Sequence, residues 1–188
     1  MTSSNLTADC ARCCALCCVA YAFERSLEFA AAKEAHSSCE HLDGGFRCSI
    51  HAERASVGYP GCVAYDCFGA GQHVTQTVFG GRAWTELAEP ALMFEAFLVV
   101  HGLLEQVALL QTALRFDLPF SSRARLHERV AQLLSLVATD PEGLRNVELA
   151  WERGATNTLL QTLRPHVARA RRALPVILDA PLDGKKAG

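Results

Sequence analysis

The sequence predicts a mainly helical protein in which a Cys-rich metal-binding module with short loops and strands packs on a helical bundle. All nine cysteines lie between residues 10 and 67, and none lies in the 121 residues after Cys67. After residue 90 the chain changes to long apolar stretches at helical spacing. We therefore expect a Cys-rich module over residues 1–88, a helical bundle over 89–178 and a disordered tail over 179–188.

The expected elements of the module begin with a helix over residues 10–33. This stretch is rich in Ala, contains no Gly or Pro, and follows Asp9, a suitable N-cap. The run Asp43-Gly44-Gly45 predicts a tight turn. The stretch VTQTVFGGRAW, which starts at residue 74, predicts a short strand closed by two glycines.

The bundle is expected to begin with a helix over residues 91–116, because Pro90 suits the first turn of a helix. This stretch is apolar on nearly all faces, which predicts a central, buried helix. Ser121 and Ser122 are expected to cap a second helix. Its apolar residues fall at helical spacing: Leu126, Val130, Leu133, Leu134 and Val137.

Two further helices are expected after residue 139. Asp140 as cap and Pro141 at the first helical position predict the start of the third, with Glu142 in its first turn. Pro165 is expected to kink or break the fourth. The apolar residues expected to face the core are Leu144, Val147 and Trp151 in the third helix and Leu159, Leu160, Leu163 and Val167 in the fourth.

Composition limits the classes of function. The formal net charge of −2 gives no indication of a nucleic-acid partner. The first residues contain no basic region followed by an apolar one, and the apolar run 91–104 contains Glu95 and His101, so we expect neither a secretory signal nor a membrane span. We expect a cytoplasmic protein. In a reducing compartment, an odd number of clustered cysteines favours metal or cluster ligation over disulfides.

The first five thiols have a helical spacing of their own. In a helix over 10–18, one face would carry Cys10, Cys13, Cys14 and Cys17, with Cys18 at its edge. A second segment would have to complete the coordination, and the four later cysteines can supply it. Thiolates suit Zn²⁺, Cu⁺ and iron–sulfur clusters.

The cysteine series also resembles a known family. Cys10, Cys13 and the pair Cys17-Cys18 are followed by a C-x-x-L motif at residues 39–42, a C-x-I-H motif at 48–51, and a further pair of cysteines. This order is similar to the YkgJ-type zinc- or iron-chelating cysteine-cluster family, which also includes flagellin lysine N-methylases. Residues 61–84 further resemble the N-terminal Cys-rich region of some actinobacterial pentapeptide-repeat proteins. The resemblance covers about residues 8–85 and implies metal or cluster binding.

Within this pattern Cys14 is the odd one out. The expected ligands are the other eight: Cys10, Cys13, Cys17, Cys18, Cys39, Cys48, Cys62 and Cys67. His51 is a further candidate ligand. Eight thiolates can form two tetrahedral zinc sites, two four-iron clusters, or one site with spare thiols. We prefer an iron–sulfur cluster over zinc because the thiols are so crowded.

Three functions follow as alternatives. The first is a metal- or iron–sulfur-binding protein with a redox or accessory role. The second is a metal- or cluster-dependent enzyme that modifies a peptide or small molecule; a pocket containing His51, His73 or Gln72 would favour it. The third is a structural zinc module that presents the helical bundle to a protein partner. The residues leave open whether the chain catalyses a reaction, and its catalytic residues are unknown.

Overall fold

The computed structural model describes residues 6–167 and is mainly helical, as predicted. Over this range the chain forms no strand beyond two isolated bridges, one joining Phe23 to Lys33 and one joining Leu42 to Cys48. The predicted tail over 179–188 and the end of the predicted bundle lie outside the described residues.

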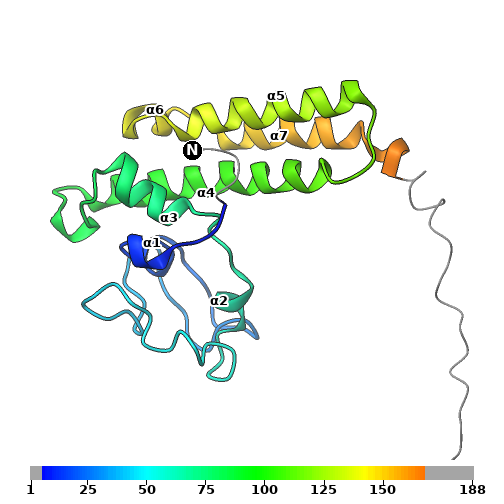
Figure 1. Cartoon of the computed structure of the whole chain (residues 1–188). Helices are drawn as coiled ribbons and strands as arrows, with labels where there is room; N and C mark the ends of the chain where they lie inside the picture. Colours follow the sequence, from blue (N-terminus) through cyan, green and yellow to red (C-terminus); the bar gives the residue numbers. More distant parts are fainter. Residues whose placement is uncertain (1–5, 168–188) are drawn as a thin grey trace, which may run out of the picture.

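Helix α4, Pro90–Ala113, is the centre of the molecule. Helices α5, Phe120–Val137, and α7, Leu149–Gln161, lie along one side of it, together with the short α6, Pro141–Arg145 (Figure 1). The Cys-rich region lies on the opposite side of α4 (Figure 1). Because α4 is covered from both sides, its apolar residues are buried around much of its circumference, as predicted.

Helix α4 also has the length and apolar composition of a membrane span, and over the described residues it is the one helix that does. However, 56% of its most apolar stretch is buried inside the protein. The core helix of a globular protein has the same composition, so this helix by itself indicates no membrane.

A buried polar network ties α4, α5 and α7 together. The guanidinium of Arg129 on α5 donates to the Glu152 carboxylate on α7 at 2.5 Å and to the Thr156 hydroxyl at 3.2 Å. Thr156 in turn donates to the amide oxygen of Gln106 on α4 at 2.7 Å. Because these groups are buried, each needs its partner to offset the loss of water.

Several predicted boundaries in the bundle are wrong. Helix α5 begins at Phe120 after Pro119, so Ser121 and Ser122 lie inside its first turn rather than at its cap. The predicted third helix is split into α6 and α7 by residues 146–148. The Asp140 cap is confirmed, because its carboxylate accepts a hydrogen bond from the Gly143 N–H at 2.8 Å.

The predicted fourth helix is interrupted, since α7 already contains Leu159 and Leu160 and ends at Gln161. Residues 162–163 form a turn, and residues 164–167 are helical again. The helix is therefore broken before Pro165. Pro165 itself lies in the first turn of the next helical segment, where proline is tolerated.

The Cys-rich region contains only short helices. They are η1 (Cys10–Arg12), α1 (Leu16–Ala20), α2 (Pro60–Ala64), α3 (Ala70–His73), the π-helical turn η2 (Val74–Val78) and η3 (Trp84–Glu86). The predicted helix over 10–33 is wrong, because Ala15 has a left-handed backbone with φ of 58° that separates η1 from α1. The predicted strand after residue 74 is also wrong, since that segment is helical.

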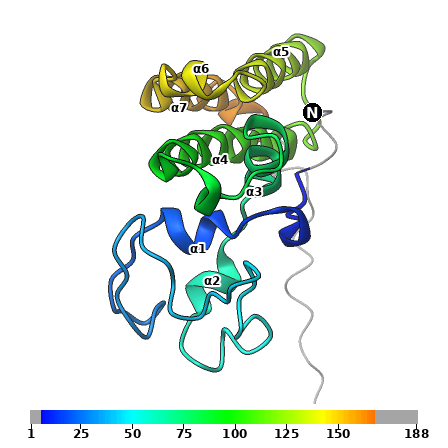
Figure 2. The ribbon, with the colours of Figure 1, turned by 90° about the vertical axis from the view of Figure 1, so that its left-hand side faces the viewer.

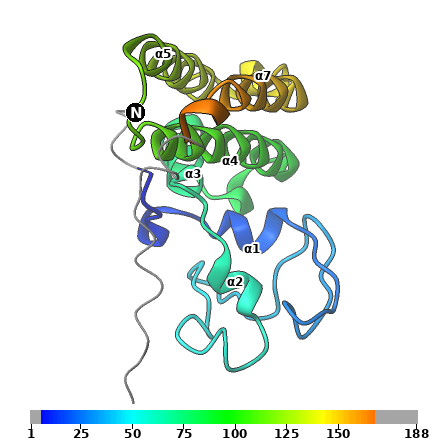
Figure 3. The ribbon, with the colours of Figure 1, turned by 90° about the vertical axis from the view of Figure 1, so that its right-hand side faces the viewer.

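Helix α1 attaches this region to the bundle. Leu16, Val19 and Ala20 are buried and belong to the same apolar core as the α4 residues. Figures 2 and 3 show α1 against α4, with α2 and the loops of residues 21–59 on the far side of α1. The Cys-rich loops contribute only partly buried residues such as Leu42 and Phe46 to this core, and α1, Ala70 of α3 and Val74 of η2 connect the region to it.

Candidate functional site

Three chain segments bring the expected ligands into the region around α1. The Cys39 N–H donates to the Cys18 carbonyl at 3.0 Å, which joins the second segment to the first. The Arg47 guanidinium donates to the carbonyls of Cys10 and Ala11. Hydrogen bonds to main-chain carbonyls thus hold the cysteine segments together, in addition to the packing of Cys13, Cys17 and Cys67 against the core.

The thiols influence one another in two overlapping groups that share Cys18. The first thiol set is Cys10, Cys13, Cys17 and Cys67. Burial, then the Cys67 thiol and then the Cys18 thiol raise the pKa of Cys10. The pKa of Cys17 is raised by its hydrogen bond with Cys18, by burial, and by the charges of Cys18, Cys13 and Cys67.

The second thiol set is Cys18, Cys39, Cys48 and Cys62. Burial raises the pKa of Cys62, and the charges of the other three members raise it further. Burial likewise raises the pKa of Cys39, with smaller contributions from Cys18 and Cys48. Since like charges act on each other only over short distances in a protein, these thiols are neighbours.

The two sets meet at the adjacent cysteines of α1. The Cys17 and Cys18 sulfur atoms lie 3.9 Å apart, although they belong to different sets. The hydrogen bond from Cys17, with help from Lys33 and Arg54, lowers the pKa of Cys18 to about 7 against the opposing effect of burial. Cys18 therefore ionises more readily than Cys17 or Cys13 when no metal is bound.

This difference predicts a selective reaction. In reduced, metal-free protein, the alkylation rate of Cys18 by iodoacetamide should rise about tenfold from pH 6 to pH 8, because the thiolate is the reacting form. Burial raises the pKa of Cys13 to about 11, so Cys13 should stay unmodified over this range. Peptide mapping by mass spectrometry measures both. Equal rates at Cys18 and Cys13 would contradict the prediction.

Positive charges surround the second set. The Lys33 ammonium donates to the carbonyls of Val19, Glu34 and Ser37 at 3.1, 2.9 and 2.8 Å, which fixes it beside the thiols. Burial lowers its pKa, whereas the charges of Cys39 and Cys18 raise it. A fixed cation here stabilises thiolates over thiols.

Arg54 lies between the two sets. Its guanidinium donates to the carbonyls of His51 and Cys62 at 2.8 and 2.9 Å, and its charge lowers the pKa of Cys10, Cys18 and Cys62 against burial. Sequence reasoning missed Arg47 and Arg54. Arg47 is adjacent to Cys48, and Arg54 lies three residues after His51. Arginines are common in loops, so these positions alone did not indicate that either residue lies beside the thiols.

Backbone N–H groups point at two of the sulfur atoms. Hydrogen bonds from the main chain of Leu16 and Ala15 lower the pKa of Cys13, although burial has the larger effect. A hydrogen bond from the main chain of His41 acts in the same way on Cys39. Gly71 lets Cys13 pack closely, since a Cβ at Gly71 would lie 2.6 Å from the Cys13 sulfur. Such N–H donors favour the thiolate form.

The ninth cysteine, Cys14, also raises the pKa of its neighbour Cys13, but its own side chain is buried. Cys14 is 3% exposed and lies in the apolar core, where its sulfur is 3.6 Å from the Met93 sulfur and 3.4 Å from the Thr75 hydroxyl. Its carbonyl accepts a hydrogen bond from the Trp84 indole at 3.0 Å. Cys14 therefore serves the packing of α1 on α4.

The candidate histidines and Gln72 are dispersed. His51 lies on an exposed loop. The ring of His73 is buried against the bundle, where Nε2 lies 2.9 Å from the Val137 carbonyl. The amide of Gln72 bonds the main chain of Thr7 and Asp9. The structure does not bring these three side chains together.

The thiols are neighbours, but they are not arranged at coordination distances. In residues 6–167, no group of three or more His, Cys, Asp or Glu side chains lies close enough to hold a metal ion. The sulfur atoms of either set would have to move closer together to bind one.

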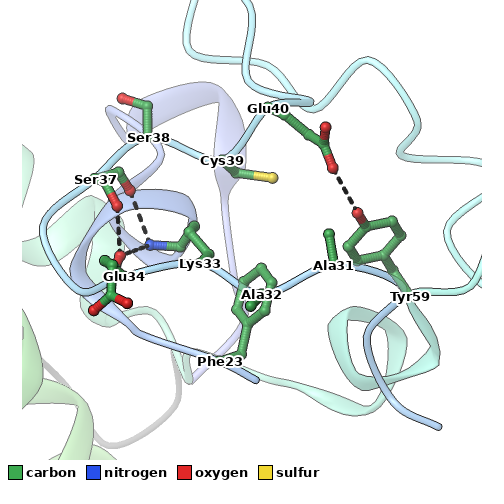
Figure 4. A pocket seen from close by; sticks show the side chains of 10 residues that line it. All are labelled: Phe23, Ala31, Ala32, Lys33, Glu34, Ser37, Ser38, Cys39, Glu40 and Tyr59. Atoms are coloured by element: carbon green, nitrogen blue, oxygen red, sulfur yellow. Dashed lines mark hydrogen bonds between the residues drawn. The ribbon is translucent and has the colours of Figure 1, made fainter. Parts of the chain in front are cut away.

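A cavity of about 300 Å³ lies beside the second set. Figure 4 shows Cys39 on its wall, between Lys33 and the Glu40–Tyr59 pair, in which the Tyr59 hydroxyl donates to the Glu40 carboxylate at 2.9 Å. Phe23 forms part of the lining. This cavity gives small solutes a route to the Cys39 sulfur.

Comparison with known proteins finds one similar curated protein, an uncharacterized protein named YybG from Bacillus subtilis (strain 168). The two sequences are 34% identical over 169 residues, which is 89% of this chain and 61% of YybG. The chain thus spans less than two thirds of the length of this relative. No family model and no solved structure matches the chain.

Proposed function

We propose that this chain binds two metal centres through cysteine thiolates, one in each thiol set. The observation that supports this is the concentration of eight thiols around α1, where they raise one another's pKa in two groups that share Cys18. Four thiolates complete a tetrahedral zinc site or hold a four-iron cluster. The cations Lys33, Arg47 and Arg54 and the N–H donors near the thiols all favour the thiolate form, which is the form that binds metal.

The surroundings of the thiols fit such centres. A site with four thiolates carries excess negative charge, which Lys33 and Arg54 would offset in the second set and main-chain N–H groups would offset at Cys13. The thiols must lose protons and move together to ligate. Since most residues of loops 21–59 are exposed and only a few, such as Leu42 and Phe46, pack on the core, we expect such movement to be local, and metal binding would be coupled to local folding.

Between the candidate metals we prefer iron–sulfur clusters over zinc. Clusters of this kind would supply one-electron transfer, and the proposed role is redox or accessory. This preference rests on the crowding of eight thiols in residues 10–67. Two zinc ions would instead make a structural module, with the bundle as the surface for a protein partner. We propose a cytoplasmic location for either form.

An enzyme that modifies a peptide or small molecule is the second candidate function. The observation that favours it is the cavity at Cys39, which would give a substrate access to the second centre. The lining of this cavity contains Lys33, Glu40 and Tyr59, and none of His51, His73 and Gln72, which were considered from the sequence.

Metal analysis with a visible spectrum on protein purified without oxygen tests the proposal. Two four-iron clusters would give brown protein with about eight iron atoms per chain and absorption that dithionite bleaches. Colourless protein with about two zinc ions per chain would support two centres but overturn the choice of iron. Protein that contains no metal and takes up neither zinc nor iron would overturn the proposed function.

A further inference from the structure

Cys67 is the member of the first thiol set that comes from a distant part of the chain. Cys10, Cys13 and Cys17 lie close together in the sequence, whereas Cys67 follows Cys17 by fifty residues. Closing a loop of this length costs conformational entropy, so tertiary contacts have to hold Cys67 beside the other three.

His101 on α4 contacts the residues on both sides of Cys67. Its Nε2 lies 3.0 Å from the carbonyl oxygen of Asp66, the residue before the cysteine. Its ring is stacked on that of Phe68, the residue after it, with centroids 6.0 Å apart and planes 15° from parallel. The ring of Tyr65 also lies against it, with a centroid distance of 5.2 Å. One side chain of the bundle thus contacts three residues within two positions of Cys67.

The backbone turns sharply directly after Cys67. Phe68 has a left-handed backbone with φ of 50°, which is unfavourable for a residue with a side chain and persists only where surrounding contacts hold it. Two contacts do so here. The Phe68 N–H donates to the Asp66 carboxylate at 2.8 Å, and the Phe68 ring stacks on His101. The direction in which the Cys67 side chain leaves the chain therefore depends on this turn and on His101.

The same histidine is also bonded to the segment that carries Cys17. The Asp66 carbonyl can only accept, so His101 Nε2 carries a proton, and burial lowers the pKa of His101, which keeps the ring neutral. Nδ1 is then an acceptor, and the Tyr21 hydroxyl, 2.7 Å away, donates to it. Tyr21 directly follows α1, which contains Cys17. His101 thus joins the Cys67 segment to α1 through two hydrogen bonds of one ring.

A second contact places the Cys67 segment against the first set. The Ala70 N–H donates to the Cys67 carbonyl at 2.8 Å, which starts the turn into α3. Gly71 in α3 lies so close to Cys13 that a Cβ there would be 2.6 Å from the Cys13 sulfur. The segment is therefore attached on both sides of Cys67, to His101 through residues 65–68 and to Cys13 through Gly71.

We propose that His101 is a positioning residue that holds the Cys67 thiol in place as a ligand of the metal centre of the first set. This inference rests on the proposed function, because it requires a metal at that set. His101 is not itself a ligand, since both of its ring nitrogens are engaged by Tyr21 and Asp66. Residues that orient metal ligands typically change metal affinity by about 10- to 100-fold.

Cobalt titration of the reduced full chain tests the proposal. The first set is isolated by the double substitution Cys39→Ser and Cys62→Ser, and sulfur-to-cobalt charge-transfer absorption reports Co²⁺ bound by thiolates. Adding His101→Phe keeps an aromatic ring next to Phe68 but removes both hydrogen bonds, and it should weaken Co²⁺ binding about tenfold. His101→Gln can still donate to the Asp66 carbonyl, so it should recover part of this loss.

Two further variants show whether His101 acts through Cys67. In the first-set chain that also carries Cys67→Ser, adding His101→Phe should cause no further loss of affinity, because the thiol that it positions is already absent. The matched control isolates the second set by Cys10→Ser with Cys67→Ser. There, His101→Phe should leave Co²⁺ affinity unchanged. Far-UV spectra establish that each variant is folded.

The outcomes separate the two proposals. Unchanged first-set affinity in His101→Phe would overturn the role of His101 while leaving the two centres intact. An equal loss in the second-set control, or an undiminished loss in the Cys67→Ser chain, would show a general packing defect and would also overturn it. No charge-transfer band in the unsubstituted chain would overturn the proposed function itself, and this inference with it.

Discussion

Replacing Cys10 and Cys67 together with serine should leave the protein with about half of its metal. The first thiol set then has two thiolates in place of four, which is too few for a tetrahedral zinc site or a four-iron cluster. The second set keeps all four ligands and its cations Lys33 and Arg54. Metal analysis after purification without oxygen measures the ratio to the unsubstituted protein.

A complementary double variant and a control variant test whether the two thiol sets bind metal independently. Cys39→Ser with Cys62→Ser should remove the other half, and the two pairs combined should remove all metal. Cys14→Ala is the matched control, because its thiol lies in the core beside Met93, and it should keep the full metal content. If either double variant keeps full metal, or either loses all of it, the division into two independent sets is wrong.

Arg129→Ala should lower the free energy of unfolding of the bundle by about 3–5 kcal/mol. The Arg129 and Glu152 side chains are only 10% and 12% exposed and are 2.5 Å apart. Removing the guanidinium leaves a buried carboxylate without its charge partner and deprives Thr156 of a donor. Urea unfolding followed by the helical far-UV signal, which the bundle dominates, measures the change.

Arg153→Ala is the matched control for this prediction. Arg153 pairs with Glu105 at 3.0 Å, and it also joins α7 to α4, but both side chains are about half exposed. Exposed pairs contribute little, so the cost should be below about 1 kcal/mol. Similar costs for the two variants would show that burial of the Arg129 network does not matter to the stability of the bundle.

The helical bundle could largely be predicted from the sequence, because its signals are local. The apolar residues of α4 and the proline at its start define that helix without reference to the rest of the chain. The Asp140 carboxylate caps the backbone three residues away. The Arg129 network could not be predicted, since its members come from three helices, and nothing in the spacing of their positions relates them.

The secondary structure of the Cys-rich region was predicted less well from the sequence. An Ala-rich stretch without Gly or Pro has high helix propensity, yet residues 10–33 form only η1 and α1. Distant contacts outweigh that propensity: the Trp84 indole bonds the Cys14 carbonyl, and Gln76 bonds the carbonyl of Arg12. Propensity differences of a few tenths of a kcal/mol per residue are easily overcome by such bonds.

The sequence by itself determined that the thiols are concentrated in residues 10–67, that a buried helix follows them, and that four-thiolate sites are the chemistry to test. Only the tertiary structure decided which thiols are neighbours, because Cys67 joins Cys10 and Cys17 across some fifty residues of loop. It also brought the Cys17 and Cys18 sulfur atoms within 3.9 Å of each other and placed Lys33 and Arg54 beside the second set. Charges and hydrogen bonds act through space, so the spacing of residues along a loop does not predict which of them will interact.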